Sequence, residues 1–207
     1  MTRLRGAFSR LTRPSRRADI VPMALPRLQG PFTVDQYQRL GERGVLGEDD
    51  RVELIAGRVV AMTPIGDRHA ACVRRLNRLF ARTLLDLAIT DVQNPIVLGR
   101  HDAPQPDLVL LKLRADGYPA HPRAADVLLI VEIADSSVAD DRDVKLPLYA
   151  RAGIPEVWLV DLPADRIAVY RAPTAGTYTR THVVSRGDTV TALQFPNGML
   201  SVDEILG

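Results

Sequence analysis

Two short apolar runs constrain the fold of this chain more than any other feature. They span Leu108–Leu111 and Val127–Ile133, are rich in Val, Ile and Leu, and lie between Pro, Asp and Ser residues. Runs of this length without regular polar alternation are typical of β-strands buried on both faces. The sequence therefore predicts two strands whose faces are both covered by other parts of the chain.

Each run carries one acid where a hydrophobic residue is expected. Asp107 directly precedes the first run, and Glu132 lies near the end of the second. An ionised carboxylate at the end of a buried strand is costly unless a cation or several hydrogen bonds compensate it. Mg²⁺ prefers oxygen ligands, usually one or two carboxylates completed by waters and substrate phosphates. The two acids, with the main-chain carbonyl of Ile133, predict a shared Mg²⁺ site; the alternative is that Glu132 accepts main-chain N–H groups.

A lysine follows on a predicted helix over roughly 138–152, which Ser136 or Ser137 can cap. The chain has 25 arginines but only two lysines. The use of lysine at position 145 therefore indicates that a compact, deprotonatable ammonium is required there. Such a group can orient a metal-bound water or neutralise charge on a phosphoryl transition state. The alternative is a surface ion pair between Lys145 and Asp141, which are spaced i,i+4.

The segment 51–63 alternates apolar and polar residues about Ala56-Gly57, which predicts a β-hairpin. Glu53 shares one face of this hairpin with Ile55. If that face looks inward, Glu53 is a third interior carboxylate. If it looks outward, Glu53 is a cross-strand partner of Arg58, and the alternation leaves both possibilities open.

Two helices are predicted before the apolar runs. Thr33 and Gln36 form a T-x-x-Q capping box for a short helix, and Asp67 is predicted to cap a longer helix that reaches about Ala88. The apolar stripe of the longer helix is expected to contain Val73, Leu76, Leu79, Phe80, Leu84 and Leu87.

Basic residues on the longer helix are candidate substrate contacts. Arg74 and Arg78 lie on the side away from the apolar stripe, where they either meet a phosphate backbone or form a solvated face. His69 lies in the first turn, where it either makes a local hydrogen bond or contacts a phosphate.

The remaining patterns predict mostly strands. We expect a helix kink at Pro147 and a helix stop at Gly153. Strands are predicted at 92–98 and 156–161, an antiparallel pair at 166–171 and 177–184, and a final helical turn at 201–206.

With 207 residues, 46% of them hydrophobic, the chain is large enough for one domain with its own core, which we assign to residues 31–207. Residues 1–30 contain seven arginines and one acid without apolar periodicity, so they are predicted to form a disordered basic tail. This tail is either an arm that scans nucleic-acid phosphates or a segment without a binding site.

Composition also argues against several classes of protein. No apolar run approaches the roughly 18–20 residues of a membrane-spanning helix, and no apolar segment of a secretory signal follows the basic start. The single cysteine, Cys72, excludes an intramolecular disulfide and a cysteine-based zinc site. These features favour a cytoplasmic protein without membrane contact.

Several strings of this sequence resemble the Uma2 family, a branch of the PD-(D/E)XK nuclease superfamily. They are VELIAGRVVAMTP, PDLVLL, LLIVEIADSS and DRDVKLPLYARAGIPEVWLVD, and the likeness extends from about Pro31 to Arg171. The resemblance implies an α/β, restriction-endonuclease-like fold, with a mixed β-sheet core flanked by helices. The antiparallel pair predicted near the C-terminus would be an addition to that core.

The resemblance also implies a role for each of four residues. Glu53 would face inward and bind metal with Asp107 and Glu132, and Lys145 would be the catalytic lysine. The superfamily's E-x-K motif places its lysine two residues after the glutamate, where this chain has Ala134. In the Uma2 branch the lysine is supplied by the following helix, so Lys145 is its natural substitute.

These observations lead to the hypothesis of a Mg²⁺- or Mn²⁺-dependent endodeoxyribonuclease that acts on DNA as a homodimer. The alternative is a nuclease-fold module that binds nucleic acid or a protein without turnover. A serine hydrolase using Ser136 or Ser137 is disfavoured because no G-x-S-x-G motif surrounds them.

Overall fold

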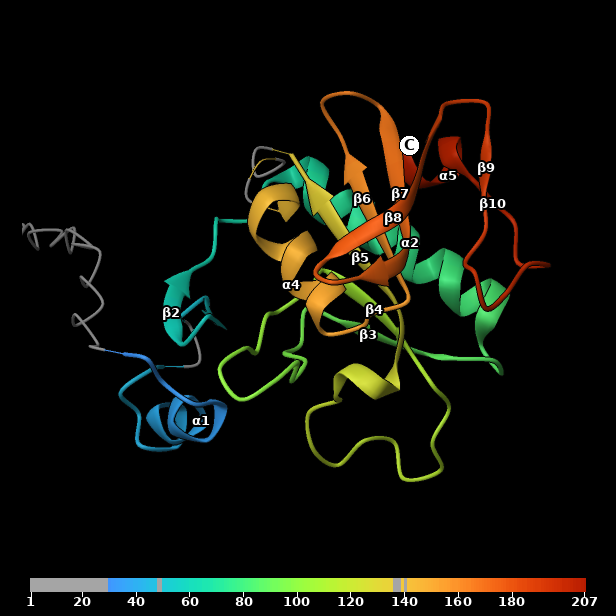
Figure 1. Ribbon diagram of the computed structural model, residues 1–207. Coiled ribbons are helices and arrows are strands. Elements are labelled where there is room, and N and C mark those ends of the chain that lie inside the picture. Colours follow the sequence, from blue (N-terminus) through green and yellow to red (C-terminus); the bar gives the residue numbers. More distant parts are fainter. Residues whose placement is uncertain (1–29, 48–49, 136–138, 140) are drawn as a thin grey trace, which may run out of the picture.

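The computed structural model describes residues 30–207 except 48–49, 136–138 and 140. Its centre is a six-stranded mixed sheet in the order β3-β4-β5-β6-β7-β8 (Figure 1). Among the described strands, β5 and β6 form the one parallel pair of this sheet. The predicted basic tail lies outside the described residues except for Gly30.

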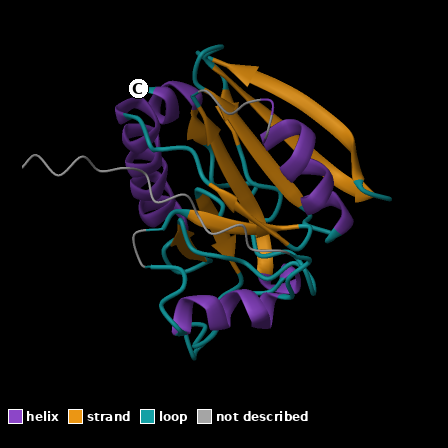
Figure 2. Ribbon diagram, turned by 90° about the vertical axis from the view of Figure 1, so that its left-hand side faces the viewer, coloured by secondary structure: helices purple, strands orange, loops and turns teal. Residues whose placement is uncertain are grey.

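The two apolar runs form neighbouring central strands, as predicted. β4 spans Leu108–Leu111 and β5 spans Val127–Ala134. Successive side chains of a strand point to opposite faces, so Leu108 and Leu110 join one core while Val109 and Leu111 join another. Helices cover the sheet on both sides (Figure 2), which is why both runs lack polar alternation.

The first core lies between the sheet and two helices, α2 (Asp67–Leu84) and α5 (Val202–Leu206). In it the ring centroids of Phe80 and Trp158 are 6.1 Å apart. The second core lies under α4 (Leu146–Arg151), which buries Leu146 and Tyr149 against the sheet.

The N-terminal part matches its predicted elements. Helix α1 spans Val34–Glu42 and begins with the reciprocal capping box of Thr33 and Gln36. The hairpin consists of β1 (Val52–Ile55) and β2 (Arg58–Ala61), with positive φ angles at Ala56 and Gly57. A Cβ atom at Gly57 would lie only 2.7 Å from that of Pro31, so the turn requires glycine for space as well as for conformation.

The boundaries of α2 and of the next strand differ from prediction. Gly66, not Asp67, is the N-cap of α2, and the helix ends at Leu84 because the chain then turns toward the sheet. Leu87 is consequently outside the buried stripe and 55% exposed. Strand β3 spans Ile89–Val92 rather than 92–98, and it ends where Gln93 adopts a positive φ angle.

Within residues 141–151, the predicted helix over 138–152 consists of two pieces with different geometry. A π-helical turn, η2, spans Asp141–Lys145, and α4 follows. Pro147 lies in the first turn of α4 rather than at an internal kink, because proline lacks the N–H that continuing the helix would require. Gly153, with φ +76°, follows the last turn as expected, whereas the suggested caps Ser136 and Ser137 lie outside the described residues.

The C-terminal region contains the expected strands and two short additional ones. β6 spans Glu156–Asp161, and β7 (Arg166–Thr174) and β8 (Thr177–Ser185) form the antiparallel hairpin. The additions β9 (Thr189–Val190) and β10 (Leu200–Ser201) pair with each other before α5. The 3₁₀ turn η1 (Ala124–Asp126) precedes β5. Within the described residues, no helix is both long and apolar enough to cross a membrane.

Candidate active site

Strand pairing brings the two predicted metal-binding acids to the same end of the sheet. β4 and β5 are antiparallel with Leu108 opposite Val131, so the residue before β4 lies beside the residue after Val131. These residues are Asp107 and Glu132, which are only 8% and 3% exposed.

Asp107 is held by donors from three segments. The Oδ2 atom accepts the main-chain N–H of Ile133 at 2.8 Å and lies 2.9 Å from Nε2 of His69, and Oδ1 lies 3.3 Å from Nε2 of Gln93. An ionised carboxylate only accepts hydrogen bonds, so Nε2 of His69 donates. Main-chain N–H donation, suggested for Glu132 from the sequence, is thus found at Asp107.

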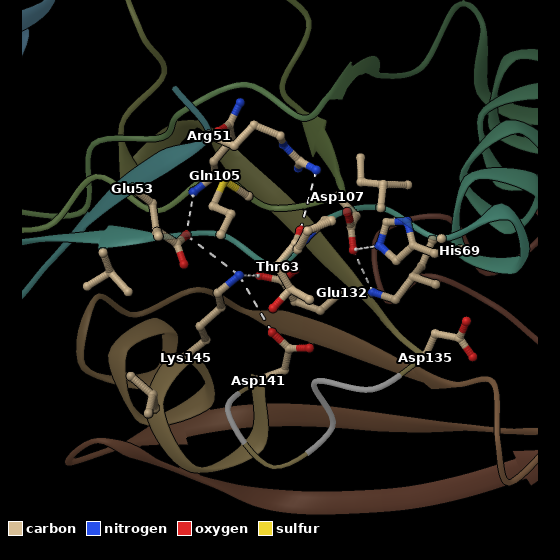
Figure 3. A pocket seen from close by; sticks show the side chains of 18 of the residues that line it. Arg51, Glu53, Thr63, His69, Gln105, Asp107, Glu132, Asp135, Asp141 and Lys145 are labelled. Atoms are coloured by element: carbon tan, nitrogen blue, oxygen red, sulfur yellow. Dashed lines mark hydrogen bonds and ion pairs between the residues drawn. The ribbon is translucent and has the colours of Figure 1, made fainter. Parts of the chain in front are cut away.

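Lys145 reaches the acids from the other side of the pocket, where η2 directs it inward (Figure 3). Its Nζ atom lies 3.3 Å from Oε1 of Glu132. It also lies 3.6 Å from Oε2 of Glu53 and 3.6 Å from Oδ1 of Asp141. The lysine side chain is 13% exposed, and Asp141 is buried as well. The i,i+4 pair of Asp141 and Lys145 is therefore present, but inside the site rather than on the surface.

Glu53 faces inward, which the hairpin pattern left open. β1 contacts the segment before Asp107 through a bridge between Leu54 and Ala103, and the Oε2 atom of Glu53 accepts the N–H of Gln105 at 3.1 Å. The outward alternative is wrong, because Glu53 is only 7% exposed and lies opposite Val60 rather than Arg58.

Burial and mutual repulsion change the protonation of the cluster. Burial raises the pKa of Glu132 to about 8, although Lys145 opposes this change and the Tyr149 hydroxyl donates a hydrogen bond to Oε1. Burial alone would lower the pKa of Lys145, but the carboxylates of Glu132, Glu53 and Asp141 outweigh it and raise that pKa. Lys145 is therefore a persistent cation in this arrangement, whereas its use in place of arginine suggested a deprotonatable amine.

These side chains line a pocket of about 490 Å³ between the hairpin, the start of α2 and η2 (Figure 3). Glu53, Asp107, Glu132 and Lys145, all predicted from the sequence to belong to one site, face it together. His69 also lines the pocket through its contact with Asp107.

Residues 34–203 match the sequence model of the Uma2 family, which is described as "Putative restriction endonuclease". The chain belongs to the Uma2 family. Its fold is similar to a crystal structure described as that of "a putative nuclease belonging to DUF820" from Anabaena variabilis, with a TM-score of 0.69 and 19% identity over 85% of this chain and 98% of that one. No curated protein matches the sequence.

This Uma2 chain departs from the E-x-K spacing, but the amine of Lys145 still lies close to Glu132. Ala134 occupies the position two residues after Glu132, and it is buried at the end of β5. The ammonium of Lys145 instead comes from η2 and lies 3.3 Å from Glu132. A lysine 13 positions after the glutamate in sequence therefore reaches it in space.

The two arginines predicted to bind substrate lie outside the pocket of the Uma2 site. Arg74 and Arg78 are exposed on α2, roughly 10 and 17 Å along the helix from Asp67 at the usual rise per residue. They occupy one side of the helix because they are four residues apart. Their predicted contact with phosphates would therefore involve substrate beyond the pocket.

Several participants were not predicted from the sequence, among them Gln93 and Gln105, which donate to Asp107 and Glu53. Asp141 was considered only as a surface partner of Lys145, although its i,i+4 spacing was the available signal. Tyr149, one further turn along, donates to Glu132, and Asp135 lines the pocket wall. No spacing rule pointed to Tyr149 or Asp135, because their places follow from how α4 and β5 pack.

Some of the residues in the pocket are suited to binding a divalent ion. Within the part of the chain that is described, no three His, Cys, Asp or Glu side chains form a ready metal cluster. Asp107 and Glu132 are nevertheless oxygen donors that line one pocket, and Mg²⁺ commonly takes one or two carboxylates. The Oε2 atom of Glu53 faces Gln105 and Lys145, so its role as a third ligand stays a prediction.

Proposed function

We propose that this Uma2 protein is an endonuclease that hydrolyses phosphodiester bonds of DNA with Mg²⁺ or Mn²⁺. One observation carries the proposal: two acids from adjacent strands and the amine of Lys145 converge in one pocket, with Nζ of Lys145 3.3 Å from Glu132. Membership of a family described as restriction endonucleases supports the same reaction class.

The proposed roles follow from the contacts. Asp107 and Glu132 would hold the ion, and His69 together with the N–H of Ile133 fixes the Asp107 carboxylate. A bound divalent ion supplies Lewis-acid polarisation of a phosphoryl oxygen. Lys145, kept charged by its carboxylate neighbours, would hydrogen-bond the attacking water and neutralise charge on the transition state.

Substrate binding extends beyond these residues. Arg74 and Arg78 would contact phosphates flanking the cleaved bond, because both are exposed on the helix that starts at the pocket. DNA as the substrate rests on the family resemblance, a homodimeric state is part of the hypothesis formed from the sequence, and a cytoplasmic location rests on cysteine usage.

A supercoiled plasmid nicking assay tests the proposal. Wild-type protein should nick the plasmid in Mg²⁺ or Mn²⁺ but not in EDTA. Asp107→Asn and Lys145→Met should lower the rate by at least about 100-fold, because they remove charges at the reacting phosphate. Lys112→Met is the matched control, since the side chain of Lys112 is exposed outside the pocket.

Two outcomes would contradict the proposal. Equal nicking by the wild type and the two site variants would assign the activity to another site or to a contaminant. DNA binding without nicking in either ion would favour the alternative of a nuclease-fold module without turnover, which the existing ion pairs of Lys145 also allow.

A further inference from the structure

Three exposed aliphatic side chains border the pocket that holds the acids. Val60 on β2, Ile65 before α2 and Val144 in η2 line it and are 41%, 39% and 47% exposed. Single exposed aliphatic residues are common, whereas a group of them around one opening indicates a contact surface. We refer to Val60, Ile65 and Val144 as the aliphatic rim.

The acids that line the same pocket are far more deeply buried than this rim. Glu132 and Asp107 are almost completely buried, so a phosphate must enter the pocket to approach them. The volume of about 490 Å³ falls in the range of roughly 300–1,000 Å³ that is usual for pockets enclosing small ligands. A space of this size suits a nucleotide that leaves its helix better than the side of an intact duplex.

The aliphatic rim and the buried Lys145 together match two parts of one nucleotide, the face of its base and its phosphate. In a duplex the faces of the bases are stacked, and only their edges are accessible in the grooves. An unpaired nucleotide exposes a flat, largely apolar base face beside its charged phosphate. The aliphatic rim can cover that face while the phosphate lies near Lys145.

The rim side chains also limit what can be read from the base. Val60, Ile65 and Val144 carry no side-chain hydrogen-bond donor or acceptor. Hydrophobic contact with a base face does not depend strongly on which base it is. A preference arising here would concern base pairing rather than base sequence.

We propose that the aliphatic rim binds the base of an unpaired nucleotide, so that the substrate class of this site is DNA containing unpaired nucleotides. This inference rests on the proposed nuclease function for the placement of the phosphate. It adds a preference for single-stranded, bulged or flapped DNA over a fully paired duplex, without strong sequence selectivity.

The experiment compares three labelled substrates of one sequence: a paired duplex, the same duplex with a three-nucleotide bulge, and the single strand. Cleavage is followed in Mg²⁺, and binding is followed separately by fluorescence anisotropy in Ca²⁺. The rim variant is Val60→Ser with Ile65→Ser. The control is Val183→Ser, a similarly exposed valine on β8 that does not line the pocket.

We expect the wild type to bind and cleave the bulged and single-stranded DNA about tenfold better than the duplex. The rim variant should lose roughly five- to tenfold in affinity for the unpaired substrates, because apolar contact area is removed, and change little on the duplex. Val183→Ser should behave as the wild type on all three.

Equal binding of paired and unpaired DNA, or an equal loss on all substrates in the rim variant, would overturn the inference. The binding arm separates this result from failure of the proposed function. A preference for unpaired DNA that depends on the rim, without cleavage of any substrate, would support the inference while rejecting the nuclease.

Discussion

At the scale of single residues, the protonation states of the pocket define what Lys145 can do. Burial alone would lower the pKa of Lys145, but three acidic side chains within 3.6 Å of its Nζ atom raise it. An amine with a raised pKa serves as a hydrogen-bond donor and counter-charge rather than as a general base. In the proposed reaction, the residues that fix the position of Lys145 therefore matter as much as the lysine itself.

Asp141→Asn should lower kcat by about tenfold with little change in KM, because the amide no longer attracts the Lys145 ammonium. The control is Asp143→Asn in the same turn, whose carboxylate is exposed and paired with Arg142 at 2.8 Å. Steady-state kinetics of the two variants provide the measurement. The same kcat in both would show that Asp141 does not position the lysine.

The raised pKa of Glu132 predicts a pH-dependent stability. The folded protein binds a proton that the unfolded chain loses near its ordinary pKa of 4.5, so the contribution is complete below that pH and disappears as the pH rises toward about 8. Unfolding by urea in EDTA should show wild type losing a few kcal/mol, to order of magnitude, over this interval. Glu132→Gln should show a shallower decline, and parallel curves would refute the assignment.

At the scale of elements, the strands were predicted better than the turns that determine where functional side chains point. The strands at 108–111, 127–134 and 156–161 are apolar enough to be identified without their neighbours. The π-helical form of η2 was not predicted, because it depends on Pro147 and on how α4 packs, and neither leaves a periodic pattern. The shift of the predicted strand at 92–98 has a similar cause, since a positive φ angle at Gln93 is not visible in hydropathy.

A buried cluster at Glu156 joins β6, β7 and the segment after β9. Its carboxylate accepts the indole N–H of Trp158 at 2.9 Å, Nε of Arg171 at 2.8 Å and the N–H of Leu193 at 2.5 Å. Glu156→Ala would leave a guanidinium and an indole N–H without this acceptor, at a cost of about 3–5 kcal/mol in the free energy of unfolding.

The comparison for Glu156 is Glu204→Ala, which breaks an exposed ion pair with Arg82 and should cost at most about 1 kcal/mol. Urea unfolding of both variants provides the measurement. Similar losses in the two would mean that the buried cluster adds little to the stability of the sheet.

At the scale of the whole molecule, the site combines three distant parts of the chain. The hairpin contributes Glu53, the centre of the sheet contributes Asp107 and Glu132, and η2 contributes Lys145 (Figures 1 and 3). The sequence alone indicated the pair of acids, because Asp107 directly precedes one buried run and Glu132 interrupts the other. The inward orientation of Glu53 needed the family resemblance, since hairpin alternation does not specify which face meets the rest of the molecule.

The connection between β5 and β6 has a consequence for recognising similar proteins. Because these strands are parallel, the chain must cross over the sheet, and the docked helix, rather than the number of intervening residues, sets where the lysine comes to rest. Insertions or deletions in that crossover can be absorbed without moving the lysine away from the glutamate. Searches that require a fixed interval between glutamate and lysine will therefore overlook such proteins, whereas searches for a strand followed by a lysine-bearing helix should retrieve them.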